Sequence, residues 1–337
     1  MARARWWCAA LALVQHCSVD ASLPSRGISS SVVGGAAASF NAQILTAYYS
    51  GVGLDTIGTS GLNSISIAFF SPAAMASSAC NFSDIATPCI QPAAGGGNYD
   101  MQYLHDTITT ALPLLAPSSL PFLPLIFISF GGANCGGAPW DAIGGDAATA
   151  TAFGANAAAL VHTLAAAFPG GAFGVDLDIE GTSTSLPHTP ALIAAYRAAA
   201  PYPAFPLQLC ALSGLALASS TDHWKVALLA AAGPAQGGLS HVNLMVDNVI
   251  EPCAVYAPWW NATELAFLPP YSRNGGCWGI IFPTFILHGP GCTDGPTPLF
   301  PWMQYATGLA VWEWWVGDAT PLIAVISAVR RAPSAPW

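Results

Sequence analysis

The chain has 337 residues, of which 53% are hydrophobic and 7% are charged, and its formal net charge is -9. The hydrophobic content is sufficient for a large core and excludes a disordered chain. The acidic balance, with Lys225 as the only lysine, excludes the basic surface that nucleic-acid binding requires, whereas an uncharged polymer such as a polysaccharide suits so weakly charged a surface.

The first 21 residues are predicted to be a secretory signal peptide. Arg3 and Arg5 form a basic start, an apolar run follows over Trp6–Val14, and Val19-Asp20-Ala21 resembles a cleavage site with small residues. The apolar run is too short to cross a bilayer, which takes about 20 residues. We therefore expect a secreted, extracellular protein.

The rest of the chain is predicted to be soluble, with no membrane segment. Its most apolar stretch, Leu112–Phe130, is broken by four prolines and cannot form one long helix. Two N-glycosylation triplets, Asn81-Phe82-Ser83 and Asn261-Ala262-Thr263, agree with secretion.

The cysteines indicate disulfides and no metal site. Removal of Cys8 and Cys17 with the signal peptide leaves seven of the nine cysteines, so at least one thiol stays free or pairs between chains. The close pairs Cys80/Cys89 and Cys277/Cys292 are plausible loop disulfides in an oxidising compartment. No CxxC and no Cys/His cluster is present, so we expect no zinc.

Apolar strand-like runs recur along the chain, with alanine-rich helical stretches between several of them. Runs that are apolar nearly throughout are typical of parallel strands buried on both faces. Eight such runs predict an α/β fold, a (β/α)8 TIM barrel in a single domain over residues 40–331, after a linker at 22–39 and before a tail at 332–337. A doubly wound open sheet is the competing arrangement. The predicted strands are Gln43–Tyr49, Ser64–Phe70, Leu125–Phe130, Gly174–Glu180, Gln208–Ser213, His241–Val246, Gly279–Phe282 and Leu309–Trp312. The predicted helices are Ala147–Phe168, Pro190–Ala200, Asp222–Ala232 and Pro321–Arg331.

The most informative segment is Phe173–Gly181, in which acids alternate with apolar residues. Asp176, Asp178 and Glu180 share one face of the strand. A half-exposed antiparallel strand would place these acids in water. The helical patterns on both sides instead indicate a βαβ unit, whose apolar face packs on helices, so that the acids point into the barrel. Repulsion between them would raise the pKa of at least one acid, and a protonated acid at the barrel mouth, Glu180, is what glycoside cleavage requires. Metal binding is a minor alternative, because no second ligand cluster accompanies the strand.

This strand resembles the DGxDxDxE signature of glycoside hydrolase family 18, the chitinase family. The family also carries S-x-G-G at the end of its third strand, and Ser129-Phe130-Gly131-Gly132 matches that motif. Weaker similarities follow in the family's order, and the sixth-strand pattern is similar to that of plant-type, hevamine-like members. These segments are Ala47–Gly51, Ser66–Phe70, Met245–Cys253 and Gly308–Trp312.

The resemblance implies hydrolysis of β-1,4-linked N-acetylglucosamine, in chitin or related glycans, by a substrate-assisted retaining mechanism without a cofactor. Glu180 would be the general acid and base, Asp178 would orient the substrate acetamido group, and Asp176 would share a proton with Asp178. The protein would act as a monomer. The substrate-binding residues implied by the resemblance are Tyr48, Phe70, Gly131, Gly132, Met245, Asp247, Asn248 and Trp312.

Two positions depart from the family pattern. Phe173 replaces the first acid of the signature, and we expect it deep in the barrel, where it would make the surroundings of Asp176 more apolar. Asp247 occupies the place of the sixth-strand tyrosine. A hydrolysis-dead, glycan-binding lectin on the same barrel is therefore the alternative function, and an unrelated secreted protein is a third.

The remaining residues of interest are given structural interpretations. Most of the 12 tryptophans are predicted to fill core or loops, with Trp312 the best candidate for the floor of the cleavage subsite. The dispersed histidines are interpreted as structural. The glycine-rich stretches lack nucleotide-binding spacing.

Overall fold

The computed structural model describes residues 44–51, 53–77, 80–82, 89–92, 100–115, 124–132, 135–181, 186–212, 233, 237–245, 277–283 and 308–312. The predicted signal peptide, linker and tail lie outside these residues. So do the predicted helices over 222–232 and 321–331, the residues Asp247 and Asn248, and the pairing partner Cys292.

Eight parallel strands pair in chain order, and the last pairs with the first, so the described strands form a closed barrel. Each lies within or overlaps one of the eight predicted runs. The fourth strand ends at Asp178, so Glu180 lies just beyond it. The strands are β1 Ile44–Tyr49, β2 Ser64–Phe70, β3 Leu125–Gly131, β4 Ala172–Asp178, β5 Leu207–Leu212, β6 His241–Met245, β7 Cys277–Pro283 and β8 Gly308–Trp312.

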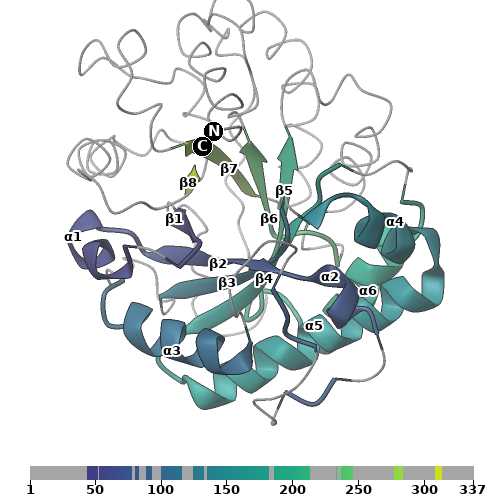
Figure 1. Ribbon diagram of the computed structural model, residues 1–337, viewed down its shortest axis with the longest axis horizontal. Helices are drawn as coiled ribbons and strands as arrows, with labels where there is room; N and C mark the ends of the chain where they lie inside the picture. Colours follow the sequence, from purple (N-terminus) through teal and green to yellow (C-terminus); the bar gives the residue numbers. More distant parts are fainter. Residues whose placement is uncertain are drawn as a thin grey trace, which may run out of the picture.

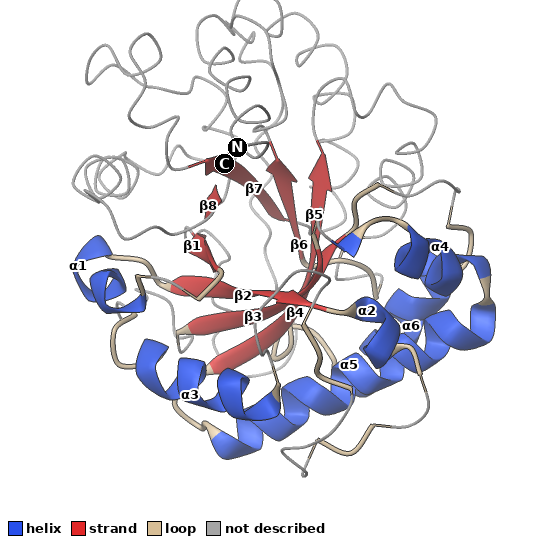
Figure 2. Ribbon diagram, viewed as in Figure 1, coloured by secondary structure: helices blue, strands red, loops and turns tan. Residues whose placement is uncertain are grey.

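Helices follow the first four strands and lie along the outside of the sheet, which confirms the α/β class (Figures 1 and 2). The predicted helices over 147–168 and 190–200 are confirmed as α5 and α6. Sequence reasoning missed α3, which precedes the proline-rich stretch, and α4, which follows a glycine-rich one. The described helices are the 3-10 helix Leu54–Thr56, α1 Ile57–Ser60, α2 Pro72–Met75, α3 Met101–Ala111, α4 Ala138–Gly145, α5 Ala147–Ala167 and α6 Thr189–Ala199.

The longest helix, α5, owes its apolar composition to its packing. Asp146 caps its start by accepting a hydrogen bond from the Thr149 backbone N–H at 2.7 Å. Gly154 lets α6 approach closely, because a Cβ there would collide with the Leu192 carbonyl oxygen. Among the described helices, α5 is the one long and apolar enough to cross a membrane by length and composition, and half of its most apolar window is buried within the protein.

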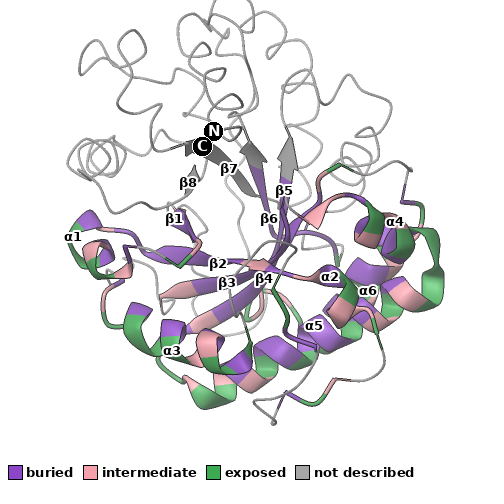
Figure 3. Ribbon diagram, viewed as in Figure 1, coloured by how far each residue is buried: buried purple, intermediate pink, exposed green. Residues whose placement is uncertain are grey.

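The first strands of the barrel are largely buried (Figure 3), but their two faces differ in chemistry. Side chains facing the helices form one hydrophobic core, and in β4 these are Phe173, Val175 and Leu177. The alternate positions of the first six strands are buried and largely polar. Strand pairing aligns these positions around the barrel: Ser129 pairs with Asp176, Asp176 with Gln208, and Gln208 with His241. The barrel interior is therefore where buried polar groups meet.

Candidate active site

Asp176 lies at the centre of a hydrogen-bonded cluster inside the barrel. Its carboxylate accepts hydrogen bonds from Ser129 Oγ at 2.6 Å and from Gln208 Nε2 at 2.8 Å. The Tyr48 hydroxyl also hydrogen-bonds to it. Because these donors come from β3, β5 and β1, neighbouring and opposite strands converge on one fully buried carboxyl group.

Tyr48 joins opposite sides of the barrel. Its hydroxyl accepts hydrogen bonds from Gln208 Nε2 at 3.2 Å and from Asn243 Nδ2 at 3.4 Å. The side chain is 1% exposed, and burial together with the negative Asp176 raises its pKa well above 10.0. The phenol thus stays protonated and keeps a hydrogen to donate. We call Tyr48, Ser129, Asp176, Gln208, Asn243 and His241 the Asp176 network.

Burial raises the pKa of Asp176 from 3.8 to about 6, although hydrogen bonds from Ser129, Gln208 and Tyr48 act in the opposite direction. The sequence predicted a raised pKa in this strand, and the structure confirms that direction. The predicted cause was wrong, because desolvation and not repulsion by a neighbouring acid is the main contribution. A carboxyl group that is partly protonated in weak acid is therefore built into the barrel.

Asp178 is held at the end of β4 through its backbone. Its carbonyl oxygen accepts hydrogen bonds from the Gly132 N–H at 3.0 Å and from Trp140 Nε1 at 3.2 Å. Gly131 has a φ of 115°, and a Cβ there would collide with the same carbonyl oxygen. The predicted glycines therefore position Asp178, and the fully buried Trp140 supports it from α4.

Glu180 follows β4 and is partly exposed, whereas Asp176 and Asp178 are buried. Gly181 comes next with a φ of 65°, a conformation that turns the chain away from the strand. Of the three predicted catalytic residues, Glu180 is thus the one within reach of solvent at the carboxyl end of the strands, where barrel enzymes place their active sites.

Cys210 is a component of the site that sequence reasoning missed. It pairs with Asp178 in the β4–β5 ladder, is 1% exposed and hydrogen-bonds to Tyr48. Burial, followed by the charges of Asp178 and Asp176, raises the pKa of its thiol well above 9.0. The signal for such residues was available: Gln208 and Cys210, like His241 and Asn243, occupy alternate positions in otherwise apolar strands.

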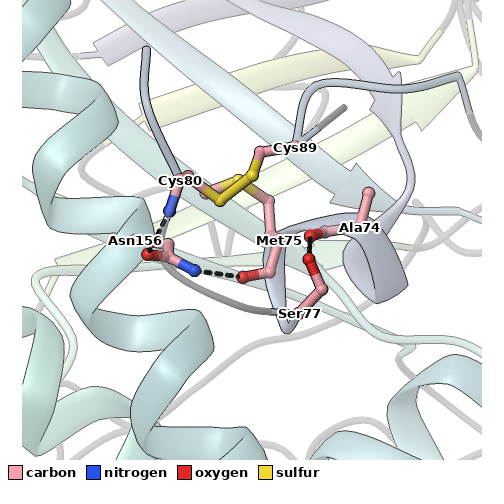
Figure 4. The surroundings of a disulfide bond; sticks show 6 residues. All are labelled: Ala74, Met75, Ser77, Cys80, Cys89 and Asn156. Carbon is pink, nitrogen blue, oxygen red and sulfur yellow. Dashed lines mark hydrogen bonds between the residues drawn. A yellow bond between two sulfur atoms is a disulfide. The ribbon is translucent and has the colours of Figure 1, made fainter. Parts of the chain in front are cut away.

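The predicted disulfide between Cys80 and Cys89 is present (Figure 4). It closes the segment after β2, and this segment is also fastened to α5. Asn156 Oδ1 accepts from the Cys80 N–H at 3.3 Å, while its Nδ2 donates to the Met75 carbonyl at 2.8 Å. The described part of the segment after β2 is therefore held by a covalent bond and by side-chain hydrogen bonds.

The structure places Phe70 away from the site. Its ring is fully buried and lies 6.0 Å from Phe130 in the hydrophobic core under the helices. The ring near Tyr48, at 6.3 Å, belongs instead to Phe69, which also lies where a Cβ on Gly132 would project. The β2–β3 register shifts between Ile67 and Phe70, and this irregularity exchanges the faces of the two phenylalanines.

The expectation for Phe173 was wrong. Its ring lies in the layer between sheet and helices, 6.2 Å from Phe168 at the end of α5. Residues 173 and 176 are an odd number of positions apart, so they lie on opposite faces of the strand. Beside Gly174, the ring that fills the barrel interior is that of Phe127. Phe173 therefore does not make the surroundings of Asp176 more apolar.

Met245 and Trp312 end β6 and β8, where the structure describes their strand pairing: Met245 with Leu212 and Ile281, and Trp312 with Pro283. Asp247 and Asn248 lie outside the described residues. Within the described part of the chain, no group of three or more His, Cys, Asp or Glu side chains could hold a metal ion.

Comparison with known proteins gives a similarity in fold. No family model matches the chain, and no curated protein matches it. Among solved structures, the crystal structure of a GH18 chitinase from Pseudoalteromonas aurantia superimposes with a TM-score of 0.52 and 15% sequence identity, over 85% of this chain and 99% of that one. The chain therefore shares, at the level of the fold, the architecture of a GH18 chitinase.

Proposed function

We propose that the chain is a secreted glycoside hydrolase with a complete (β/α)8 barrel, which cleaves β-1,4-linked N-acetylglucosamine in chitin or related glycans. The observation that carries the proposal is the arrangement of acids on and after β4. Two buried carboxyl groups, Asp176 and Asp178, lead along one strand face to a partly exposed third, Glu180. The fold shared with a chitinase supports the same substrate class.

The proposed mechanism assigns a distinct task to each acid. Glu180, within reach of solvent, donates a proton to the glycosidic oxygen and later accepts one from water. Asp178, with its backbone fixed by Gly132 and Trp140, orients the substrate acetamido group that attacks the anomeric carbon. Asp176, with its pKa raised to about 6, exchanges a proton with Asp178 as charge develops. The hydrolysis requires no protein nucleophile, as in substrate-assisted glycosidases.

The proposal extends to location and assembly. A signal peptide at residues 1–21 would direct the chain to an oxidising compartment, and the Cys80–Cys89 disulfide supports that route. The mature protein would act as a monomer.

Turnover of a fluorogenic chitotriose substrate tests the proposed activity. Replacement of Glu180 by Gln removes the transferable proton, so we expect a loss of at least about 100-fold in kcat/KM with unchanged unfolding. Asp55→Asn, which removes an exposed carboxylate from the 3-10 helix, is the matched control and should retain full turnover. Undiminished turnover in the Glu180 variant would contradict the assignment.

A catalytically inactive glycan-binding protein is the second candidate, favoured by Asp247 at the position of the family's sixth-strand tyrosine. Chitin-oligomer binding by the wild type without any turnover would select it.

A further inference from the structure

A line of hydrogen bonds leads from His241 to the carboxyl group of Asp176. His241 Nε2 lies 2.8 Å from Asn243 Oδ1, and Asn243 Nδ2 donates to the Tyr48 hydroxyl at 3.4 Å. The Tyr48 hydroxyl in turn hydrogen-bonds to Asp176. His241, Asn243 and Asp176 are all at most 2% exposed, so water does not compete for these groups.

The chemistry of each group limits how protons can be arranged along this line. Burial lowers the pKa of His241 to about 4, so the ring is neutral near pH 7 and carries one N–H. Among the residues that the structure describes, its Nδ1 has no hydrogen-bond partner, so the contact with Asn243 selects the tautomer there. An amide presents an acceptor oxygen on one side and donor hydrogens on the other.

Two arrangements satisfy these limits. With the hydrogen on His241 Nε2, the Asn243 oxygen accepts it and the Asn243 nitrogen donates to Tyr48. The Tyr48 hydrogen then goes to Asp176, because the other neighbour of the hydroxyl, the protonated Cys210 thiol, is only a weak acceptor. With the hydrogen on His241 Nδ1, the amide turns over, its oxygen accepts from Tyr48, and Asp176 loses that donor. The tautomer of one buried histidine thus determines how many hydrogen bonds Asp176 receives.

We propose that His241 is a positioning residue, which acts through Asn243 to direct the Tyr48 hydroxyl hydrogen onto Asp176 and thereby holds the proton affinity of that carboxyl group. In its relevance to catalysis this inference rests on the proposed hydrolase function. His241 reaches Asp176 only through Asn243 and Tyr48 in this line, so its role is positioning and not catalysis. Its neutral Nε2–H tautomer keeps three donors on Asp176, from Tyr48, Ser129 and Gln208.

Other titratable groups lie on or just after the strands of the barrel, and they are present in the variants at His241 as in the wild type. Asp178 lies on β4, Glu180 lies beyond it, and Cys210 lies on β5. Cys277 is the register partner of His241 on β7. Strands β2, β3 and β8 contain no titratable residue. Differences between variants at His241 therefore isolate the hydrogen-bond line.

The test is the NMR titration of the Asp176 carboxyl carbon, with its signal assigned by its loss in Asp176→Asn. Removing the His241 ring nitrogens in His241→Phe frees the Asn243 amide to turn, so Tyr48 no longer donates to Asp176 in every molecule. We expect the titration midpoint of Asp176 to rise by about half to one pH unit. In Tyr48→Phe, which lacks the donor altogether, it should rise at least as far.

The double variant separates positioning from a structural role. If His241 acts through Tyr48, adding His241→Phe to Tyr48→Phe moves the midpoint no further. Equal shifts in both backgrounds would overturn the proposal, because they would indicate general loosening of the barrel. His105→Phe is the matched control, since His105 lies on α3 with its ring 5.1 Å from Phe168, and should leave the midpoint unchanged.

A measurement on the wild type keeps the proposal testable if a variant does not fold. The nitrogen chemical shifts of His241 near pH 7 should show hydrogen on Nε2 and a lone pair on Nδ1, and the opposite tautomer would overturn the proposal. None of these readouts requires turnover. If the chain hydrolyses chitotriose, the acidic limb of its kcat/KM profile should move in His241→Phe in the same direction as the Asp176 titration.

Discussion

The two faces of β4 are held by different interactions, although their side chains alternate along one strand. On the outer face, Val175 and Leu177 are fully buried among helix side chains, and any apolar group of suitable shape could fill their places. On the inner face, Asp176 is equally buried, yet directed hydrogen bonds hold its carboxylate. The outer face thus sets the stability of the fold, while the inner face sets the proton chemistry of the site.

The first way to sharpen this comparison is to remove volume from the outer face. Leu177→Ala leaves a cavity between β4 and the helices, and we expect the free energy of unfolding to fall by about 2–5 kcal/mol. Leu177→Met keeps the volume and should cost less than about 1.5 kcal/mol. Urea denaturation measures both changes.

The Asp176 titration midpoint should be the same in the folded state of both Leu177 variants as in the wild type. A shifted midpoint in Leu177→Met would show that the two faces are coupled, contrary to the division of tasks described above.

The difference between the faces also explains what the sequence could predict. Outer-face residues make the strand runs apolar, and this local pattern is sufficient to locate all eight strands and the helices α5 and α6. The alternation of Asp176 and Asp178 within β4 likewise indicated the inner face without any knowledge of neighbouring strands. The odd number of positions between Phe173 and Asp176 would by itself have placed the Phe173 ring correctly among the helices.

The contacts within the Asp176 network could not be predicted in the same way, although alternation marks several of its residues as inner-face positions. Tyr48, Gln208 and Asn243 are single uncharged residues on three different strands, 128, 32 and 67 positions away from Asp176 in the sequence. Their meeting depends on the register of the closed sheet, which no local pattern contains. The same reason accounts for Phe70, because the irregular β2–β3 register that turns its ring outward belongs to a pair of strands and not to one.

The second prediction concerns two inner-face groups, Asp176 and His241, whose titrations change the stability of the protein in opposite directions as pH rises. Asp176 has its pKa raised from 3.8 to about 6, so its contribution to stability is lost as pH rises through that range. His241 has its pKa lowered from 6.5 to about 4, so its contribution is lost as pH falls through that range. At about 1.4 kcal/mol per pKa unit, each amounts to about 3 kcal/mol. In the wild type the two slopes largely cancel between pH 4 and 6.

Single substitutions should expose the separate slopes. Relative to the wild type, Asp176→Asn should gain stability as pH rises from 4 to 6, whereas His241→Phe should lose it. Urea denaturation at several pH values measures both, and the difference from wild type removes the background of other carboxylates. Curves that stay parallel to wild type in both variants would contradict the opposing linkages.

The smallest predicted effect comes from Asn156, a buried polar residue in the outer, helical layer (Figure 4). Like Asp176, it makes directed hydrogen bonds, but these are to backbone groups: the Cys80 N–H and the Met75 carbonyl. Asn156→Leu keeps the volume and leaves both groups without their partner, so we expect a loss of about 1–3 kcal/mol in urea denaturation. Because this contact carries no titratable group, the loss in Asn156→Leu should be the same at pH 4 and pH 7. A pH-dependent loss would mean that the segment after β2 is coupled to the Asp176 network, and the separation of outer-layer stability from inner-face proton chemistry would then fail in this segment.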